Sequence, residues 1–389
     1  MMLCLLLSSG CSQKVDPQAT QPADFISEAK LLYRVVACSG DAPLPDAFDV
    51  KMIDRHCQPL RKRMERYRRV YLKQAEPFLA SLRPSGLPDT VVYPFGGGDL
   101  LAALTTYPDA RRITTLSLEL SGDPRRIGSM DNKRLDESLT LIDHNIGGLL
   151  AANDSTTETL MDTQQGDLPG QLSYFLVALA VHGFEPVSLR YFRVQADGSL
   201  HYYSRAEVRA QEARIAAVRH GDWTPPDFSE AFANSELVFR PVGGGPWRVH
   251  RHLGTNLRDD VLKKHGPVLR YLERQGRVAA MTKAASYCLW SPSFSHIRNY
   301  LLSKMVFMIS DGTGIPPEVA SQAGFVQETY GSFTGAMCFD DCPSDQYSAQ
   351  FRDLWASQPK RKMGFRYGYV DVKKSYHLLV TRRAPVAKT

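Results

Sequence analysis

A run of three glycines ending in an aspartate is the segment of this chain with the clearest potential for binding chemistry. Gly96, Gly97 and Gly98 stand between a predicted strand and a predicted helix, and Asp99 opens that helix. Glycines in this position let a ligand approach backbone N–H groups at the positive end of a helix dipole. Glu119 follows about 20 residues later, at the end of the next predicted strand, where doubly wound proteins use an acid to hold a ribose. One interpretation is therefore a nucleotide or S-adenosylmethionine site.

The simpler interpretation of the same segment is structural. Asp99 is a good helix N-cap, and glycines allow a tight turn before it. The pattern is not G-x-G-x-x-G, and Asp99 puts a negative charge where a phosphate would sit. We favour a cap and a turn over a ligand site. S-adenosylmethionine would tolerate the acid better than a dinucleotide would.

Other side chains that could ligate or catalyse are scattered along the chain. Asp311 follows a buried apolar run and opens Asp311-Gly312-Thr313-Gly314, which favours a turn, although a carboxylate at a strand end can face a crevice. His250 and His252 would project from one side of a strand, but arginines flank them, and we predict no metal site. Lys283 lies on a predicted alanine-rich helix. No complete catalytic set emerges, and we predict no cofactor.

Two cysteine pairs have spacings that suit disulfides. Cys38 and Cys57 lie at the facing ends of two predicted helices, and a bridge there would close a loop of about 20 residues and stabilise the fold by roughly 3 kcal/mol. Cys338 and Cys342 could form a second, tighter bridge. A zinc clip is the weaker alternative, because no second cysteine pair accompanies them. Cys288 is predicted to be a buried free thiol.

The N-terminus carries a second kind of signal. A short apolar stretch ends at Cys11 and is followed by a polar tract, as in bacterial lipoprotein signals, where the cysteine becomes lipidated after cleavage. We therefore predict a signal peptide over residues 1–10 and a tether over residues 11–24. The stretch lacks a basic start and a long apolar core, so an ordinary apolar N-terminus is the alternative. It is far shorter than the ~20 apolar residues that span a bilayer.

Composition describes a globular body with a mild positive charge. The 389 residues are 43% hydrophobic and 23% charged, with a formal net charge of +6. A dense basic cluster over residues 61–73 alternates with apolar side chains, which predicts a helix with one basic face. That face would lie in water or, as the less favoured alternative, against anionic lipid headgroups. No nucleic-acid-binding module accompanies the cluster, so we predict no nucleic-acid partner.

The order of predicted elements indicates an α/β fold. A helical N-terminal region over residues 25–85 precedes a mixed α/β body over residues 86–389. That body begins with a strand, a helix and a second strand, which predicts parallel pairing, and later has antiparallel hairpins around 196–199 and 243–245. The remaining elements are expected as helices at 134–152, 170–182, 257–275, 278–290 and 294–304, a strand at 305–310, and a terminal hairpin of 364–372 with 376–381.

Several runs resemble a family of uncharacterised bacterial proteins, many of which are described as lipoproteins. These runs begin at Val92, Met281, Phe294 and Asp311, and read VYPFGGGDL, MTKAASY, FSHIRN and DGTGIP. The similarity spans residues 90–335 and part of the tail. The family's glycine loop often reads Pro-Phe-Gly-Gly-Pro-Asp, whereas this chain has glycine in the fifth position. The resemblance implies a lipoprotein of the envelope and transfers no activity.

Taken together, the sequence predicts a lipid-anchored protein of the bacterial cell envelope, facing the periplasm or the cell surface. Its expected partners are the membrane, through Cys11, and an envelope protein or a small-molecule ligand. A binding or structural role is favoured because no catalytic set can be assembled. The alternative is an α/β enzyme with a nucleotide-like or S-adenosylmethionine-like site lined by Gly96–Asp99, Glu119 and Asp311.

Overall fold

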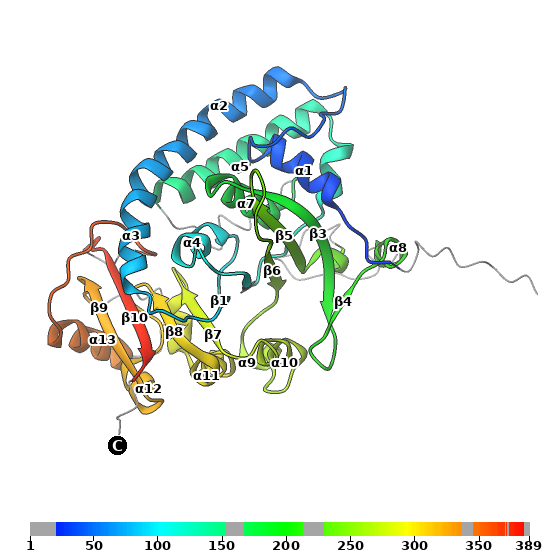
Figure 1. The fold of residues 1–389 in the computed structure, drawn as a ribbon. Coiled ribbons are helices and arrows are strands. Elements are labelled where there is room, and N and C mark those ends of the chain that lie inside the picture. The colour runs from blue at the N-terminus through cyan, green and yellow to red at the C-terminus, as the bar shows by residue number, and fades with distance from the viewer. Residues whose placement is uncertain are drawn as a thin grey trace, which may run out of the picture.

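The computed structural model of the chain describes residues 21–152, 167–212, 229–335, 345–369, 371 and 373–384. Cys11, Cys338 and Cys342 lie outside these residues, and with them the predicted lipidation site and the second predicted disulfide. The described residues form an α/β fold around one ten-stranded mixed sheet (Figure 1). None of the described helices is long and apolar enough to cross a membrane.

Five parallel strands form the centre of the sheet. In spatial order they are β6 (Arg248–Gly254), β2 (Arg112–Ser117), β1 (Thr90–Pro94), β7 (Val278–Thr282) and β8 (Met305–Ser310). Antiparallel strands extend both sides. Beyond β6 lie β5 (Ser235–Pro241), β3 (Phe184–Val194) and β4 (Leu200–Tyr202), and beyond β8 lie β10 (His377–Arg383) and β9 (Phe325–Gly331). The predicted α/β class, the parallel unit and both internal hairpins are thereby confirmed.

Helices cover both faces of the sheet, so strand β1 at its centre is apolar on both sides. On β1, Val91 and Tyr93 pack into one core, while Val92 between them packs into the other. One face carries α1 (Ile26–Val35), α2 (Val50–Arg66), α3 (Lys73–Leu82), α4 (Leu100–Thr106), α5 (Asn132–Ala152) and α7 (Gly170–Val181) (Figure 1). The other carries α9 (Asp259–Leu262), α10 (Pro267–Glu273), α11 (Ser295–Lys304) and α12 (Pro317–Gln322). Two further helices, α8 (Arg205–Glu212) and α13 (Asp345–Ser357), lie near the ends of the sheet.

Three predicted elements are wrong. Residues 278–290, expected as a helix, form strand β7 and then a short 3₁₀-helix (Ser286–Trp290), because the five-residue apolar run is buried on both faces. The helix expected over 257–275 is broken, since Gly266 and Pro267 end one turn and begin the next. The terminal hairpin does not form either. Strand β10 pairs instead with β8 and with β9, a strand that the sequence analysis missed.

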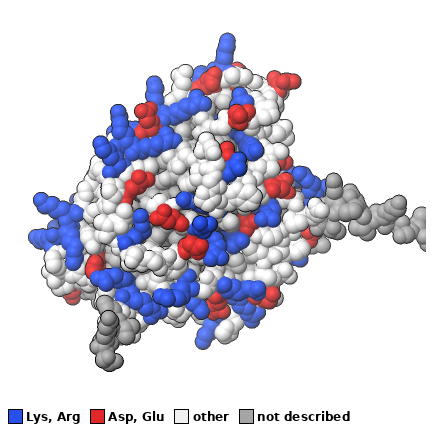
Figure 2. All heavy atoms as spheres, viewed as in Figure 1, with Lys and Arg blue, Asp and Glu red and all other residues white. Residues whose placement is uncertain are grey.

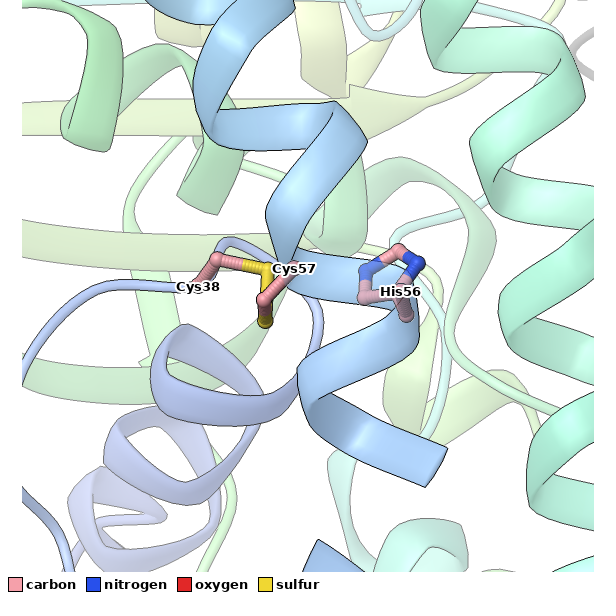
Figure 3. A group of neighbouring side chains, drawn as sticks. All are labelled: Cys38, His56 and Cys57. Atoms are coloured by element: carbon pink, nitrogen blue, oxygen red, sulfur yellow. A yellow bond between two sulfur atoms is a disulfide. The ribbon is translucent and has the colours of Figure 1, made fainter. Parts of the chain in front are cut away.

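The N-terminal helices are joined by a disulfide, as the cysteine spacing predicted. Cys38 and Cys57 are bridged, and Cys57 lies on α2 while Cys38 follows α1 (Figure 3). Both residues are buried in the larger core. The backbone at Cys38 has a φ of 55°, and its carbonyl accepts a hydrogen bond from Arg61 Nε at 3.1 Å. The bridge therefore fixes how α1 and α2 meet.

Removing this bridge should destabilise the fold. We expect the double variant Cys38→Ala/Cys57→Ala to lose roughly 3 kcal/mol of unfolding free energy, because the unfolded chain is no longer constrained. Chemical denaturation without reductant measures the difference. Cys288→Ala serves as the control, since Cys288 is a free cysteine. Equal stability of the double variant and the unmodified protein would contradict the expectation.

Candidate ligand site at the carboxyl edge of the sheet

The strand order reverses between β1 and β7. The chain first builds β1, β2 and β6 toward one side, then returns across β1 to add β7 and β8 on the other. In open α/β sheets, ligands bind in the crevice outside the carboxyl ends of the strands at such a switch point. The segments that follow β1 and β7 therefore define where a site should be sought. They contain Asp99 and Lys283, respectively.

Asp99 and Lys283 meet across this switch point. Lys283 Nζ lies 2.5 Å from Asp99 Oδ2, and the lysine side chain is only 1% exposed. Asp99 also caps α4, because its Oδ1 accepts a hydrogen bond from the Ala102 N–H at 3.0 Å. The Tyr93 hydroxyl donates to Oδ2 at 3.1 Å. The predicted cap is confirmed, and the same carboxylate in addition neutralises a buried ammonium.

Asp311 is connected to this pair through the backbone. Its Oδ2 accepts a hydrogen bond from the Ala284 N–H at 2.9 Å, and its Oδ1 accepts from the Thr313 hydroxyl at 2.9 Å. Ala284 has a φ of 65°, a conformation that L residues rarely adopt, so the turn after Lys283 is held in a strained form. The adjacent Gly368 approaches so closely that a Cβ there would lie 2.6 Å from Asp311 Oδ2.

His377 completes the polar groups beside β8. The Gly312 N–H donates to His377 Nδ1 at 2.6 Å, so the ring is neutral with its proton on Nε2. Burial lowers the pKa of His377, in agreement with a neutral ring. Nε2 itself is buried and has no hydrogen-bond partner among the residues that the structure describes.

Unused hydrogen-bonding groups gather along this edge of the sheet. Buried polar groups are normally paired, so each exception calls for an explanation such as a water or a ligand. Gln171, on the first turn of α7, is fully buried, and both atoms of its amide lack partners within the described residues. A Cβ on Gly98 would lie 2.7 Å from Gln171 Oε1, so this amide directly adjoins the glycine loop. Further unpartnered atoms within the same part of the chain are Ser117 Oγ, Thr282 Oγ1 and Ser286 Oγ.

Lys283 itself has hydrogen-bonding capacity to spare. An ammonium carries three N–H donors, and beyond the Asp99 carboxylate no acceptor for Nζ is found among the described residues. The contact is thus an ion pair that leaves donors available.

Four tyrosines lie within the electrostatic reach of the Asp99 carboxylate. Tyr67, Tyr71, Tyr93 and Tyr367 are each buried or nearly so, and burial raises the pKa of every one well above 10. The negative charge of Asp99 contributes to each of these increases. The phenols therefore stay neutral beside the ion pair.

Glu119 lies beyond the neighbouring strand, β2, and is buried. Its carbonyl accepts a hydrogen bond from His252 Nε2 at 2.7 Å. Thr115 Oγ1 lies 2.9 Å from both His252 Nδ1 and His250 Nε2. One directional chain satisfies these contacts: His250 donates to Thr115, Thr115 donates to His252, and His252 donates to Glu119. Burial lowers the pKa of His252 to about 4, so both histidines serve as neutral links that hold the segment after β2.

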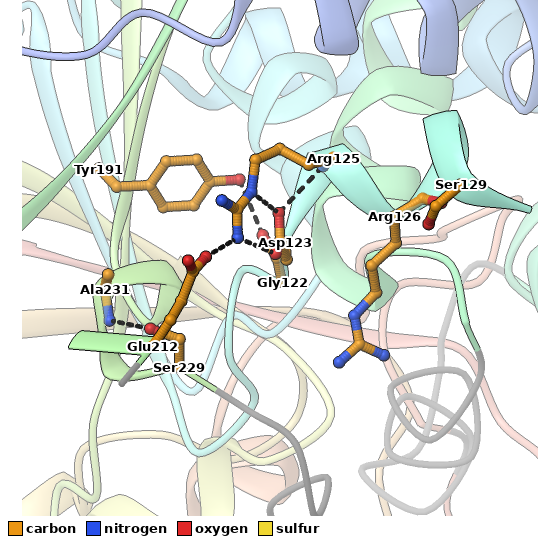
Figure 4. A network of polar contacts seen from close by, with 9 residues as sticks. All are labelled: Gly122, Asp123, Arg125, Arg126, Ser129, Tyr191, Glu212, Ser229 and Ala231. Atoms are coloured by element: carbon orange, nitrogen blue, oxygen red, sulfur yellow. Dashed lines mark hydrogen bonds and ion pairs between the residues drawn. The ribbon is translucent and has the colours of Figure 1, made fainter. Parts of the chain in front are cut away.

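An arginine network fixes the next part of that segment (Figure 4). Arg125 donates to both oxygens of Asp123, at 2.9 and 2.6 Å, and also pairs with Glu212 at the end of α8. The Tyr191 hydroxyl donates to the Gly122 carbonyl at 2.8 Å. Strand β3 and helix α8 thereby hold the loop that follows Glu119.

The described residues contain one group of side chains with metal-ligating spacing, Cys38, His56 and Cys57 (Figure 3). The two sulfurs are joined in a disulfide, so neither is available as the thiolate that a metal requires. His56 Nε2 lies 3.1 Å from the Val36 carbonyl oxygen. With the disulfide formed, this group therefore has a structural role.

Sequence reasoning identified some of these residues and missed others. Asp99 and Asp311, proposed from their positions after predicted strands, are joined through Lys283 and Ala284. Gly96, Gly97 and Gly98 form the turn before α4, with Gly98 packed against α7. Glu119 lies at the end of the next strand. Lys283 follows strand β7 and does not lie on the predicted helix, and the short apolar run 278–282 is the signal that indicates this strand. Gln171 is not among the residues predicted from the sequence.

Comparison with known protein families, with characterised proteins and with solved structures finds no match to this chain. The fold and the site define it as an α/β protein with a doubly wound parallel centre and a buried Lys–Asp pair at the switch point. Any assignment of function must come from that geometry.

The two charges should be energetically coupled. Lys283→Met leaves a carboxylate among neutral phenols, and Asp99→Asn keeps a cap while leaving a buried ammonium, so each is expected to lower the unfolding free energy by about 3 kcal/mol. The double variant should lose clearly less than the sum of the two. A double-mutant cycle by chemical denaturation measures this coupling, and strictly additive losses would contradict it.

Proposed function

We propose that the protein binds a small polar ligand at the carboxyl edge of β1, β7 and β8, and that it does so as a lipid-anchored protein of the bacterial cell envelope. The observation that carries the proposal is the Lys283–Asp99 ion pair, buried at the topological switch point. Gln171, Lys283 and Asp99 are the proposed ligand contacts.

The chemistry of the pair favours a ligand with a zwitterionic amino-acid end. A carboxylate would accept hydrogen bonds from the spare donors of Lys283, and an ammonium would donate to Asp99. Both charges of the protein would then remain compensated while the ligand is bound, which avoids leaving either one unpaired in the interior. The unpartnered Gln171 amide, beside the glycine loop, offers both a donor and an acceptor to the same ligand.

The doubly wound strand order favours, among such ligands, one that also carries a nucleoside, such as S-adenosylmethionine. If the segment from β3 to β5 is left out, the remaining strands are numbered 1 to 7 along the chain as β1, β2, β6, β7, β8, β9 and β10. Across the sheet they then lie in the order 3-2-1-4-5-7-6, and the seventh strand, β10, is antiparallel to its neighbours. Doubly wound sheets bind nucleotide-like ligands at this switch point, although a fold alone assigns no chemistry. Glu119 lies where doubly wound proteins place a ribose-binding acid.

The location of the protein bears on the choice of ligand. The Cys38–Cys57 disulfide supports an oxidising compartment, as in the envelope. S-adenosylmethionine is poorly supplied there, whereas peptides of the cell wall also carry amino-acid ends. Both kinds of ligand present the same zwitterion to Lys283 and Asp99, so the two are separated by experiment.

Ligand binding should raise the melting temperature. The probes are S-adenosylmethionine and a peptide whose diaminopimelate residue carries a free amino-acid end. At about 100 times its dissociation constant, a probe that binds should stabilise the full chain by roughly 2.7 kcal/mol. Thermal denaturation with each probe, and with nucleotides and sugars as comparison, measures the shift. Lys283→Met should abolish it because the carboxylate of the ligand loses its partner.

Lys304→Met is the matched control, because Lys304 ends α11 at the opposite edge of the sheet, directly before β8. It removes the same charge and should retain the shift. Two results would overturn the ligand site: no shift with any zwitterionic probe in the unmodified protein, or the same loss of shift in both lysine variants.

The proposed anchor has a separate test. In a bacterial host, the unmodified chain should incorporate a radiolabelled fatty acid and sediment with membranes, whereas Cys11→Ser should lose the label and become soluble. Cys4→Ser is the matched control and should keep both properties, because Cys4 precedes the predicted cleavage site. Equal labelling of the unmodified chain and Cys11→Ser would exclude this anchor without affecting the ligand site.

A further inference from the structure

A hollow opens on the helical face of the molecule, between helices α2 and α5. It has a volume of about 410 Å³, within the range typical of small-molecule pockets. It lies between the end of α2, the segment that follows it, helix α5 and the strand-free segment around residue 365. We call it the arginine pocket. Its lining includes Arg63, Arg66, Arg366, Tyr67 and Tyr71.

The charge of the arginine pocket is one-sided. Its described lining residues contain three arginines and neither aspartate nor glutamate. The rest of its wall is largely apolar or aromatic, formed by Val70, Leu150, Ala151 and Phe365 among others. A ligand that fills this space would need an anionic group and an apolar group next to each other.

One wall of the pocket is a π-helix, Tyr67–Leu72, inserted between α2 and α3. Such π-helical turns are rare and occur frequently at functional sites. Within it, Tyr67 and Tyr71 stack with ring centroids 4.8 Å apart. The pocket therefore has an irregular backbone and a flat aromatic surface beside its arginines, which ordinary helix packing does not require.

The basic cluster predicted at residues 61–73 divides into structural and available arginines. Arg61 donates to the Cys38 carbonyl, and Arg68 donates to the last carbonyls of α7, at 2.6 and 2.7 Å. Arg63 is held against α5 by Asp143 at 2.5 Å. Arg66 differs from these: it is exposed and lines the pocket, and its side chain makes no hydrogen bond or ion pair with any other residue that the structure describes.

Figure 2 places Lys and Arg side chains over the region that α2 and α3 occupy in Figure 1. The surrounding positive potential would draw an anion toward the pocket. Arg63, fixed by its carboxylate partner, and Arg66, without one, supply planar donors that match the oxygens of a phosphate group.

We propose that the arginine pocket binds a phosphate ester that carries an apolar group, with Arg66 as the principal contact to the phosphate and the Tyr67–Tyr71 stack beside the apolar part. The ester is a soluble phosphorylated compound or the headgroup of an anionic lipid, since both present the same chemistry. None of the proposed ligand contacts Gln171, Lys283 and Asp99 lines this pocket, so either site can fail without the other.

The test uses the full chain as Cys11→Ser, so that a lipid anchor does not itself bring the protein to vesicles. Isothermal titration with hexyl phosphate measures the soluble ester, and inorganic phosphate serves as the probe without an apolar group. Flotation with phosphatidylglycerol vesicles, compared with phosphatidylcholine vesicles, measures the lipid source. Hexyl phosphate is expected to bind more tightly than inorganic phosphate because its alkyl chain contacts the apolar wall.

Arg66→Gln should weaken binding roughly tenfold by removing a charge-assisted hydrogen bond. The matched control is Arg69→Gln, which removes the same charge from the π-helix that directly follows Arg66, at an exposed residue outside the pocket lining. Binding should be unchanged in the control. Circular dichroism and melting temperatures verify that both variants fold as the unmodified chain does.

The results distinguish a soluble ester from a lipid headgroup, and they also test whether the pocket binds a phosphate ester at all. Binding of hexyl phosphate without selective flotation supports a soluble ester, and selective flotation that Arg66→Gln weakens supports a lipid headgroup. Failure of both probes overturns the site. Equal weakening by Arg66→Gln and Arg69→Gln overturns it as well, because general surface charge would then account for binding.

Discussion

The buried ion pair of Lys283 and Asp99 is the constraint on which the centre of this structure depends. Neither charge can stay in the interior alone, since breaking such a pair by removing one partner costs about 3–5 kcal/mol. Lys283 follows β7 and Asp99 follows β1, so their contact requires these strands to be neighbours in parallel register. The point at which the strand order reverses is thus also the point at which the two buried charges neutralise each other.

The elements around the pair hold its loops in fixed positions. Helix α7 packs its Gln171 against the glycine loop, and the segment around Gly368 packs onto Asp311. The histidine–threonine chain and the Arg125 network hold the segment after β2. Each device fixes a loop that leaves the carboxyl edge of a strand. The strands can therefore be rigid while the chemistry of the edge is decided by its loops.

The tyrosines connect the two proposed sites physically while keeping them distinct. Tyr67 and Tyr71 line the arginine pocket, and the Asp99 charge contributes to the raised pKa of both. Neutral phenols therefore line the pocket of the arginines and at the same time lie within the electrostatic reach of the buried ion pair.

The sequence by itself determined the α/β class, the first parallel unit, both internal hairpins, the Asp99 cap and the Cys38–Cys57 bridge, because each depends on local spacing or on turn chemistry. Tertiary structure decided the rest. The run 278–282 is a strand only because both of its faces are covered, a condition that no local pattern encodes. Lys283 is a partner of Asp99, and Gln171 a neighbour of Gly98, only because distant segments meet at the switch point. Contacts between residues far apart in the sequence follow from tertiary packing, and local propensity does not predict them.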